Sequence, residues 1–335
     1  MGRIDTHAHF VPPSWRQSCE QHGHGKPDGM PEIPAWDPEQ HLSLMDKLDI
    51  EKSIVSITSP GTTLVAGDIA IAVDVTRASN DYAADLKRAR PNRFGFWASL
   101  PLPFVQESVQ EVQRALGELD ADGVGLMTNY YGQYLGDASF DPVFGELNAR
   151  SATVFIHPTG PCVMAASDDG VDNQPRRASP LKQNYPDPMF EYLFETARCA
   201  INLFLSGTVS RYPDITFVLS HAGGALPPIV QRFTTFSSAI LKLDNGVTAA
   251  TVRQMLQTRF FFDLAGFPFP DQIHGLVRYV DASRLLYGSD FPYTPAAGVE
   301  MLAQMMDKEG PVVFGEEKWE DVMYKNAQRL LARQK

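Results

Sequence analysis

Histidine or aspartate side chains follow short apolar runs at four separate places in the chain. The segments are His7-Ala8-His9, Phe155-Ile156-His157, Ser220-His221 and Gly288-Ser289-Asp290. Residues i and i+2 of a strand point to the same side, so the imidazoles of His7 and His9 can approach one ion. A single histidine at a strand end is usually structural, but four histidines with one aspartate form a nitrogen-rich set suited to Zn²⁺ or a similar divalent ion. The constellation therefore predicts a metal site.

For these side chains to meet, the runs that precede them must be neighbouring strands. Runs of β-branched and aromatic residues alternate with longer helical patterns, which is typical of a chain that alternates strands and helices. The predicted strands are 3–9, 52–58, 93–99, 123–129, 153–158, 216–222, 259–265 and 284–290. The predicted helices are 68–90, 105–119, 141–150, 188–207, 225–241, 270–280, 296–307 and 316–333.

Eight such strands favour an α/β fold with a single (β/α)8 TIM barrel over an open sheet. No linker, internal repeat or low-complexity segment divides the chain, so we interpret residues 1–335 as one domain. Two long loops, 10–51 and 159–187, follow the first and fifth strands. Both leave the carboxyl ends of strands, the face on which barrels build their active sites, so we interpret them as lids. The candidate residues end at the same face.

Charge and composition exclude several classes of protein. The net charge is −11, which disfavours a nucleic-acid partner, because binding to phosphates depends on clustered lysine and arginine. No apolar run is long enough to span a bilayer, and the amino terminus has no apolar signal core, so neither a membrane nor secretion is expected. Three scattered cysteines, Cys19, Cys162 and Cys199, fit a reducing cytoplasm. No nucleotide-binding glycine fingerprint is present, so no organic cofactor is expected.

The residues at the strand ends also resemble a known family. DTHAHF at 5–10, His157-Pro158, SHAGG at 220–224 and GSDFP at 288–292 are similar to motifs of the metal-dependent amidohydrolase superfamily. The chain resembles the branch of aminocarboxymuconate-semialdehyde decarboxylase and related aromatic-acid decarboxylases over nearly its whole length, including WDPEQHLSLMDKLDI at 36–50. The stretch that begins INLFLSG at 201–207 is most similar to fungal 6-methylsalicylate decarboxylases.

The resemblance implies a role for each candidate. It makes His7, His9, His157 and Asp290 the metal ligands, with His221 as the acid–base residue beside them. Superfamily members with two metals have a bridging lysine after strand four, where this chain reads Met127-Thr128-Asn129-Tyr130, so a single ion is expected. The ion is expected to be Zn²⁺, with Mn²⁺ as the alternative found in the same branch.

The resemblance also implies a homodimer. Arg232 lies eleven residues after His221, and in the branch the matching arginine reaches the neighbouring subunit's pocket to meet the substrate carboxylate. The opposing interpretation is an ordinary solvent-exposed arginine on the helix after strand six. A second arginine used by the semialdehyde decarboxylases has no match, because Lys26 is the only lysine or arginine in residues 17–46. That departure argues against a dicarboxylate substrate.

The predicted pocket wall is aromatic. Phe291 and Tyr293 lie beside Asp290 and are predicted to contact the substrate, as is Ser59 just after strand two. Other strand aromatics, including Trp97, are expected in the core. We expect the remaining histidines to have no catalytic role. His22 and His24 are in a glycine-flanked loop, and His41 and His274 are on surface or packing faces of helices.

The resemblance implies nonoxidative decarboxylation of a small aromatic hydroxy-acid of the 6-methylsalicylate type. In this hypothesis Asp290 delivers a proton to the carboxyl-bearing carbon, and His221 holds the proton state of Asp290 or orients the phenol. A hydrolase that opens a lactone or cyclic amide at the same site is the first alternative. A catalytically inactive barrel that serves as a binding protein is the second, although no ligand position is lost.

Overall fold

Eight short parallel strands form the centre of the molecule in the computed structural model, which describes residues 2–164, 175–181 and 184–332. They are β1 (Arg3–His9), β2 (Ile50–Ser56), a third strand in two pieces, β3 (Phe94–Phe96) and β4 (Ala98–Ser99), then β5 (Val124–Met127), β8 (Thr153–His157), β11 (Thr216–Leu219), β12 (Phe260–Asp263) and β13 (Leu285–Leu286). Nearly all of their residues are buried, as expected for parallel strands covered on both faces.

The strands follow one another in chain order around the sheet. Their neighbours run β1-β2-β3 and β4-β5-β8-β11-β12-β13. Trp97, between β3 and β4, donates its backbone N–H to Val55 of β2 at 3.0 Å and so continues the first set into the second. Just beyond β13, the Tyr287 carbonyl accepts the Thr6 N–H of β1 at 3.0 Å, which joins the last strand to the first. The predicted (β/α)8 barrel is confirmed.

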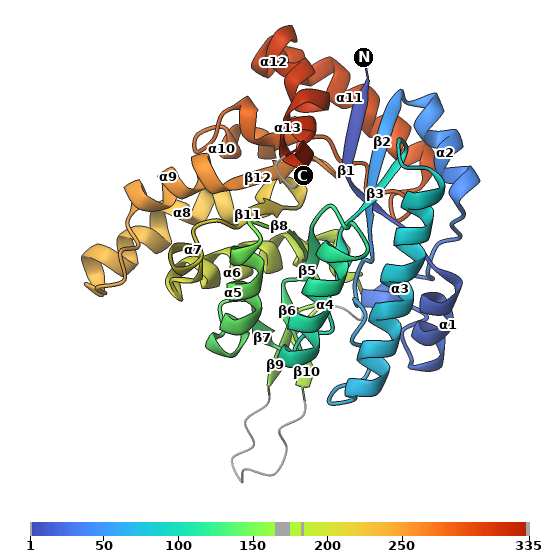
Figure 1. Cartoon of the computed structure of the whole chain (residues 1–335). Coiled ribbons are helices and arrows are strands. Elements are labelled where there is room, and N and C mark those ends of the chain that lie inside the picture. The colour runs from blue at the N-terminus through green and yellow to red at the C-terminus, as the bar shows by residue number, and fades with distance from the viewer. Residues whose placement is uncertain (1, 165–174, 182–183, 333–335) are drawn as a thin grey trace.

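Helices surround the strands (Figure 1). They are α3 (Ile69–Ala89), α4 (Val105–Gly117), α5 (Asp141–Ala149), α6 (Glu191–Leu205), α7 (Thr208–Arg211), α8 (Leu226–Thr235), α9 (Ala249–Arg259), α10 (Gln272–Leu276), α11 (Ala296–Phe314), α12 (Glu316–Glu320) and α13 (Asn326–Ala332). Single π-helical turns extend α8 over Phe236–Ile240 and join α12 to α13 over Asp321–Lys325. Within the described residues, none of the helices is both long and apolar enough to cross a bilayer.

The long loops after the first and fifth strands are present and contain structure of their own. The first holds α1 (Pro13–Gln21), a 3-10 turn at Pro27–Gly29 and α2 (Pro38–Lys47). The second holds an antiparallel pair of strands, β9 (Cys162–Met164) and β10 (Pro175–Arg177), in the lower part of Figure 1. Residues 165–174 and 182–183 of the predicted 159–187 segment lie outside the described residues. The role of both loops as lids stays a prediction.

Several element boundaries differ from those predicted. The second strand begins two residues earlier than predicted, at Ile50, and the eighth is regular only over Leu285–Leu286. Residues 287–290 have no regular strand structure but still bond to β1, and the backbone of Asp290 is left-handed, with φ of 58°. Helix α9 was not predicted, although Thr248 and Thr251 form a reciprocal capping box at its start, which is a recognisable helix signal.

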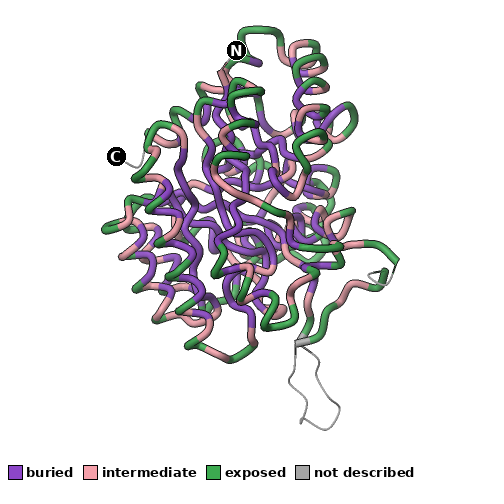
Figure 2. The backbone as a smooth tube through the Cα atoms, turned by 90° about the vertical axis from the view of Figure 1, so that its right-hand side faces the viewer, coloured by how far each residue is buried: buried purple, intermediate pink, exposed green. Residues whose placement is uncertain are grey.

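The barrel interior is filled by one layer of apolar side chains below the site. The layer comprises Ile4, Ile54, Trp97, Phe155, Val218, Phe261 and Leu286, closed from below by Ala327 and Leu330 of α13. The indole of Trp97 packs on Gly123, where a Cβ would lie 2.9 Å from its Cε3 and Cζ3 atoms. Burial is concentrated in this central region and in the strand–helix contacts around it (Figure 2). The closed interior leaves only the carboxyl-end mouth for chemistry.

Replacing the indole in this layer is expected to destabilise the fold strongly. Trp97 is fully enclosed, and its Nε1–H donates to the Thr6 carbonyl at 2.9 Å. We expect Trp97→Ala to lower the free energy of unfolding by about 3–5 kcal/mol, through the cavity and the lost contacts. Urea denaturation measures this, with Val312→Ala, at an 80% exposed position, as a control expected to change stability by less than about 0.5 kcal/mol. Equal effects of the two variants would contradict the assigned core.

Candidate metal and catalytic site

The predicted histidines and aspartate meet at the carboxyl ends of the strands. His9 Nε2 lies 3.2 Å from His7 Nε2 and 3.1 Å from Asp290 Oδ1. The His157 ring centroid lies 4.8 Å from that of His9. One potential ligand atom from each of His7, His9, His157 and Asp290 lies within 4.8 Å of all the others, so these four residues could hold a metal ion.

Each of the three imidazoles is fixed by a contact at its outer nitrogen. His9 Nδ1 donates to the Ser56 carbonyl at 3.2 Å, and His157 Nδ1 donates to the Pro158 carbonyl at 2.7 Å. His7 Nδ1 lies 3.0 Å from Asp263 Oδ2. Such partners fix the tautomer of a neutral imidazole and turn its Nε2 lone pair inward, as in metal sites whose ligands are oriented from behind. Three imidazoles and one carboxylate, gathered in this way, have the composition that a divalent ion requires.

Asp263 is a functional residue that sequence reasoning missed. It ends β12, is fully buried, and orients two parts of the site. Its Oδ2 faces His7, while its Oδ1 accepts the backbone N–H groups of His221 and Ala265, both at 3.1 Å. Burial would raise the pKa of this carboxyl, but the charge of His7 and these hydrogen bonds hold it below its usual value. Its position after the run Phe260–Phe262, two residues before the end of the predicted strand 259–265, was the available signal.

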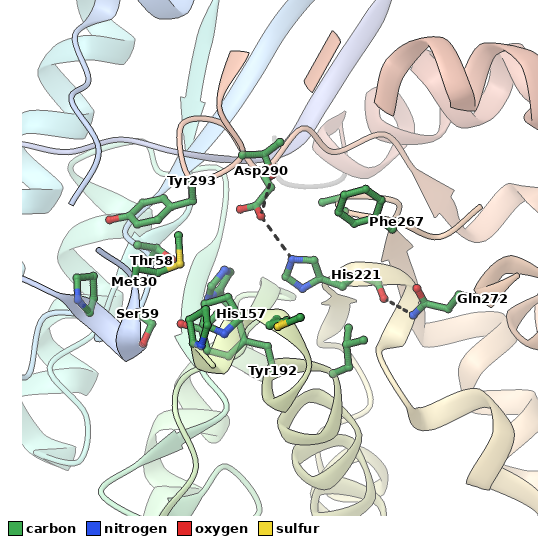
Figure 3. Close-up of a pocket in the computed structure, with 18 residues that line it drawn as sticks. Met30, Thr58, Ser59, His157, Tyr192, His221, Phe267, Gln272, Asp290 and Tyr293 are labelled. Atoms are coloured by element: carbon green, nitrogen blue, oxygen red, sulfur yellow. Dashed lines mark hydrogen bonds and ion pairs between the residues drawn. The ribbon is translucent and has the colours of Figure 1, made fainter. Parts of the chain in front are cut away.

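Left-handed backbone places the two proposed acid–base residues face to face. His221 has φ of 54° and Asp290 has φ of 58°, in a region that non-glycine residues rarely occupy. His221 Nε2 lies 3.8 Å from Asp290 Oδ2, and both side chains project into the cavity in Figure 3. Gln272 Nε2 donates to the carbonyls of His221 at 2.7 Å and Gly224 at 3.1 Å, and so holds the turn that carries His221.

The charges at the site are redistributed by burial and by neighbours. Burial lowers the pKa of His9, and it lowers that of His157 well below the ordinary value. His7 is equally buried, but the Asp263 carboxylate outweighs the burial and raises the pKa of His7 to about 9. Burial opposes ionisation of Asp290, but hydrogen bonds with His221 and His9 hold its pKa well below the usual range. Two neutral imidazoles beside an ionised carboxylate suit a metal ion.

A cavity of about 410 Å³ opens above these residues. Its polar wall includes Thr58, Ser59, Tyr192, Gln272, Tyr293 and Thr294, beside His157, His221 and Asp290. Met30, Met189, Leu193 and Phe267 contribute apolar surface, and prolines from both long loops complete the rim. Figure 3 shows the labelled side chains pointing inward from several different strands and loops. The volume is within the usual range for a small-molecule site.

Only two of the four predicted substrate contacts line the cavity. Ser59 and Tyr293 line the cavity, and the buried Tyr293 hydroxyl makes no hydrogen bond within the described part of the chain. Phe291 is turned away: it packs on Leu44 and Val299, and its carbonyl accepts the His9 N–H of β1 at 2.7 Å. Phe291 therefore does not line this cavity, which corrects the prediction for that residue.

Arg232 also lies outside the cavity of its own subunit. It is exposed on α8, and its side chain borders an apolar groove of about 470 Å³ on the outer surface. The groove is lined by Leu205, Ile229, Phe233, Phe236, Ser237, Leu241 and Leu243. Within one chain, therefore, Arg232 does not line the cavity that contains the candidate metal ligands.

The other histidines lie where no reaction chemistry is expected. His22 and His274 are exposed, and His24 Nε2 contacts the Leu64 carbonyl at 2.8 Å. His41 is buried, and Trp36 Nε1–H donates to its Nδ1 at 3.0 Å. Burial, with Arg93 nearby, lowers the pKa of His41 to about 3, so this ring is a neutral packing group.

Exchanging Asp263 for its amide is expected to weaken metal binding. In Asp263→Asn one of the two acceptor positions becomes an N–H₂ donor, which cannot accept from His7 or from the backbone N–H groups of His221 and Ala265. We expect metal affinity to fall roughly 10–100-fold, as for other residues that orient metal ligands. Competition against a coloured chelator measures this, and Asp74→Asn, on the exposed face of α3, is the control. Unchanged affinity in Asp263→Asn would contradict the orienting role.

The fold and site define a class of protein, a barrel with four residues at its mouth that could hold a metal ion, and comparison with known proteins defines it further. The amidohydrolase family model matches residues 4–333. Decarboxylase yanB of Aspergillus niger is 37% identical over 99% of this chain and 88% of its own length. 6-Methylsalicylic acid decarboxylase of Penicillium expansum is 36% identical over 88% of this chain and 86% of its own.

A solved structure has the same fold. The 5-carboxyvanillate decarboxylase of Novosphingobium aromaticivorans, complexed with manganese and 4-hydroxy-3-methoxy-5-nitrobenzoic acid, superposes with a TM-score of 0.80. It is 21% identical, and the match covers 99% of this chain and 96% of that one. The chain belongs to the amidohydrolase family and, within it, to the decarboxylases. The family resemblance given by the strand-end motifs is thereby confirmed.

Proposed function

We propose that this enzyme is a metal-dependent, nonoxidative decarboxylase of a small aromatic hydroxy-acid, of the 6-methylsalicylate type. The observation that carries the proposal is the His221–Asp290 pair, which faces the cavity directly beside three inward-pointing imidazoles. The named relatives support decarboxylation over hydrolysis, since one of them is a 6-methylsalicylic acid decarboxylase.

The reaction needs a proton at one particular ring carbon. When the bond between ring and carboxylate breaks, CO₂ leaves without its bonding electrons, and the ring carbon keeps the pair and must gain a proton. An ortho hydroxyl lets the ring carbon be protonated before the bond breaks, because its oxygen stabilises the positive charge. One proton is consumed, one CO₂ is released, and no oxidant is needed. The enzyme therefore needs a positioned proton donor and a fixed ring.

The two acid–base residues supply these needs in our proposal. Oδ1 of Asp290 faces His7 and His9, and Oδ2 faces His221 and Thr294 on the cavity side. Asp290 is the residue that delivers a proton to the ring carbon, and His221 returns a proton to Asp290 or orients the phenol. Gln272 and Asp263 act indirectly, since they fix the backbone that carries His221.

One divalent ion is proposed for the four-residue site. His7, His9, His157 and Asp290 would hold it, and it would supply Lewis-acid chemistry toward the substrate carboxylate and ortho hydroxyl. Three imidazoles and one carboxylate suit Zn²⁺, and the manganese in the related solved structure keeps Mn²⁺ as the alternative. Tyr293 and Ser59 are proposed to contact the ring substituents, and no organic cofactor is proposed.

Release of CO₂ tests the proposal directly. Metal-quantified enzyme is incubated with a panel of hydroxybenzoates that includes 6-methylsalicylate, and headspace CO₂ is measured with the matching phenol. We expect equal molar release of both products from ortho-hydroxylated acids. 2-Methylbenzoate, which has no hydroxyl to activate the ring, is expected to release none. No CO₂ across the panel from metal-loaded enzyme would overturn the proposal and favour a hydrolase.

We also propose that the active unit is a cytosolic homodimer. The exposed groove beside Arg232 is almost entirely apolar, and apolar surface of this kind commonly marks a protein interface. A second subunit on this face would bring Arg232 toward the partner's cavity, where a guanidinium can bind the substrate carboxylate. All three cysteines are free, and Cys19 and Cys199 are buried, which agrees with a reducing compartment.

Mixed dimers test the sharing of a site between subunits. Asp290→Asn and Arg232→Ala subunits, each inactive alone in this proposal, form mixed dimers in which one site is intact. Random pairing of equal amounts is expected to restore about a quarter of wild-type activity, because half of the dimers are mixed and each has one working site. Native mass spectrometry verifies the mixing. Verified mixed dimers without activity would argue against Arg232 acting across the interface.

A further inference from the structure

One buried carboxylate joins the loops around the cavity and has no role in the proposed chemistry. Asp28 lies in the 3-10 turn after β1, with φ of 51° and 1% exposure. Its Oδ2 accepts hydrogen bonds from Ser59 after β2 and from the Tyr192 hydroxyl of α6, the latter at 2.6 Å. Its Oδ1 accepts from Arg177 of β10. Two of these partners, Ser59 and Tyr192, line the cavity.

This arrangement fixes the direction of two hydroxyl hydrogens. An ionised carboxylate can only accept hydrogen bonds, so Ser59 and Tyr192 must both donate to it. The positive charge of Arg177 and these hydrogen bonds outweigh burial and keep the pKa of Asp28 below its usual value. Thr159 Oγ1 lies 2.7 Å from Ser59 Oγ and must then donate to it. Both cavity hydroxyls are thus left with lone pairs and no hydrogen to offer a ligand.

The charges around this wall also disfavour an anionic ligand group. Arg177 Nη1 also lies 3.5 Å from Oδ2 of Asp187, so one guanidinium stands between two buried carboxylates. Among the described residues that line the cavity, none is a lysine or an arginine. A negatively charged ligand group would meet no cation at this wall, whereas a neutral hydroxyl could donate to either oxygen.

We propose that Asp28 is a specificity-determining residue: it makes the Ser59–Tyr192 wall accept hydrogen bonds without donating them. The enzyme therefore selects aromatic acids that present a neutral hydroxyl to this wall, and it disfavours a methyl ether or a second carboxylate there. This inference rests on the proposed function, because it assumes that the aromatic substrate occupies this cavity. Asp28 itself does not touch the substrate.

Binding of unreactive analogues tests this specificity separately from catalysis. 2-Nitrophenols carry a planar nitro group that cannot leave as CO₂, and their colour allows titration by absorbance. A series with a hydroxyl, methoxy or carboxylate group at each remaining ring position is titrated into the metal-loaded enzyme. We expect about tenfold tighter binding of the hydroxyl probe than of its methoxy and carboxylate counterparts at one position or more, since only it can donate to the wall.

Two variants and a matched control identify the cause. In Asp28→Asn the amide N–H₂ can donate to one wall hydroxyl and turn its hydrogen toward the cavity, so the hydroxyl preference is expected to fall to about one or reverse. Tyr192→Phe removes one acceptor and is expected to reduce the same ratio. The control is Glu195→Gln. Glu195 is a buried carboxyl on α6 that accepts hydrogen bonds from Asn129 and Tyr134 and does not line the cavity, so its exchange should leave the binding ratio unchanged.

The results of these titrations distinguish a failure of the proposed role of Asp28 from a failure of the proposed decarboxylase reaction. Wild-type enzyme that binds the hydroxyl and methoxy probes equally at every position overturns the role of Asp28, as does an unchanged ratio in Asp28→Asn. If Asp28→Asn does not fold, as judged by circular dichroism, Tyr192→Phe decides, and an unchanged ratio in it overturns the inference. A hydroxyl preference that depends on Asp28, in an enzyme that releases no CO₂, would refute only the proposed reaction.

Discussion

Asp290→Asn is expected to lower turnover by roughly a thousandfold or more while leaving the barrel folded. The carboxylate combines two tasks, because Oδ1 faces His7 and His9 and Oδ2 faces His221 across 3.8 Å. The amide nearly matches the carboxylate in size, so packing at the turn of residues 288–292 should be retained. It cannot carry the proton, however, and its N–H₂ must face either the imidazoles or the acid–base partner. CO₂ release at saturating substrate measures the loss.

Metal content and fold must be measured on the same preparation. A variant that loses activity and metal together has lost a ligand, whereas one that keeps the metal has lost the proton carrier. Asp271→Asn is the matched control, since this exposed carboxyl precedes Gln272 at the start of α10 but does not line the cavity. It is expected to retain activity within about twofold, as surface changes generally do. Turnover by Asp290→Asn close to that of wild type would remove Asp290 from the mechanism.

The grouping of the four candidate metal ligands could be predicted, because in a parallel barrel each one depends only on finding the end of its own strand. His7, His9 and His157 each lie at the end of a strand recognisable from its own sequence, and parallel strands bring their carboxyl ends to one face. The register is regular enough to keep this alignment, with Met127 opposite His157 and Leu219 opposite Ile156. Errors of two residues in a strand boundary therefore did not disturb the set.

The direction of a side chain after a strand end could not be predicted in the same way. Phe291 follows Asp290 immediately, and sequence proximity alone suggested that it faces the substrate. Phe291 instead packs in a cluster with Leu44 and Val299, next to the left-handed residue Asp290. Long-range hydrogen bonds to β1 hold this segment, from the Asp290 N–H to the His7 carbonyl at 2.8 Å and from the His9 N–H to the Phe291 carbonyl at 2.7 Å.

Residues that act through long-range contacts gave little sequence signal. Asp28 is an ordinary Pro-Asp-Gly turn residue in sequence, but its carboxylate is bound by groups 31, 149 and 164 positions away. Asp263 gave a stronger sequence signal than Asp28, because it ends a strand as the candidate metal ligands do. Its selection over other strand-end residues depends on the 3.0 Å approach to His7, a contact that exists only in the folded barrel.

Removing the metal is expected to abolish turnover without unfolding the protein. The outer nitrogens of His7, His9 and His157 are held by Asp263, Ser56 and Pro158, so the inner nitrogens remain gathered when no ion binds them. The site is thus built by the barrel, in contrast to small zinc domains that fold only around the metal. Dialysis against a strong chelator is expected to reduce CO₂ release to under about one hundredth of the loaded enzyme's rate, with an unchanged circular dichroism spectrum.

Reconstitution then distinguishes the number and kind of ion. One equivalent per chain is expected to restore full activity, because the described residues place one four-residue donor set at the mouth. Zn²⁺ should bind more tightly than Mn²⁺, following the general order of divalent affinities, and the ion that gives the higher turnover identifies the catalytic form. The same titration of Asp263→Asn should need a higher concentration of either ion, since His7 loses its orienting partner. Full activity in metal-free protein, or a requirement for two equivalents, would contradict a mononuclear site.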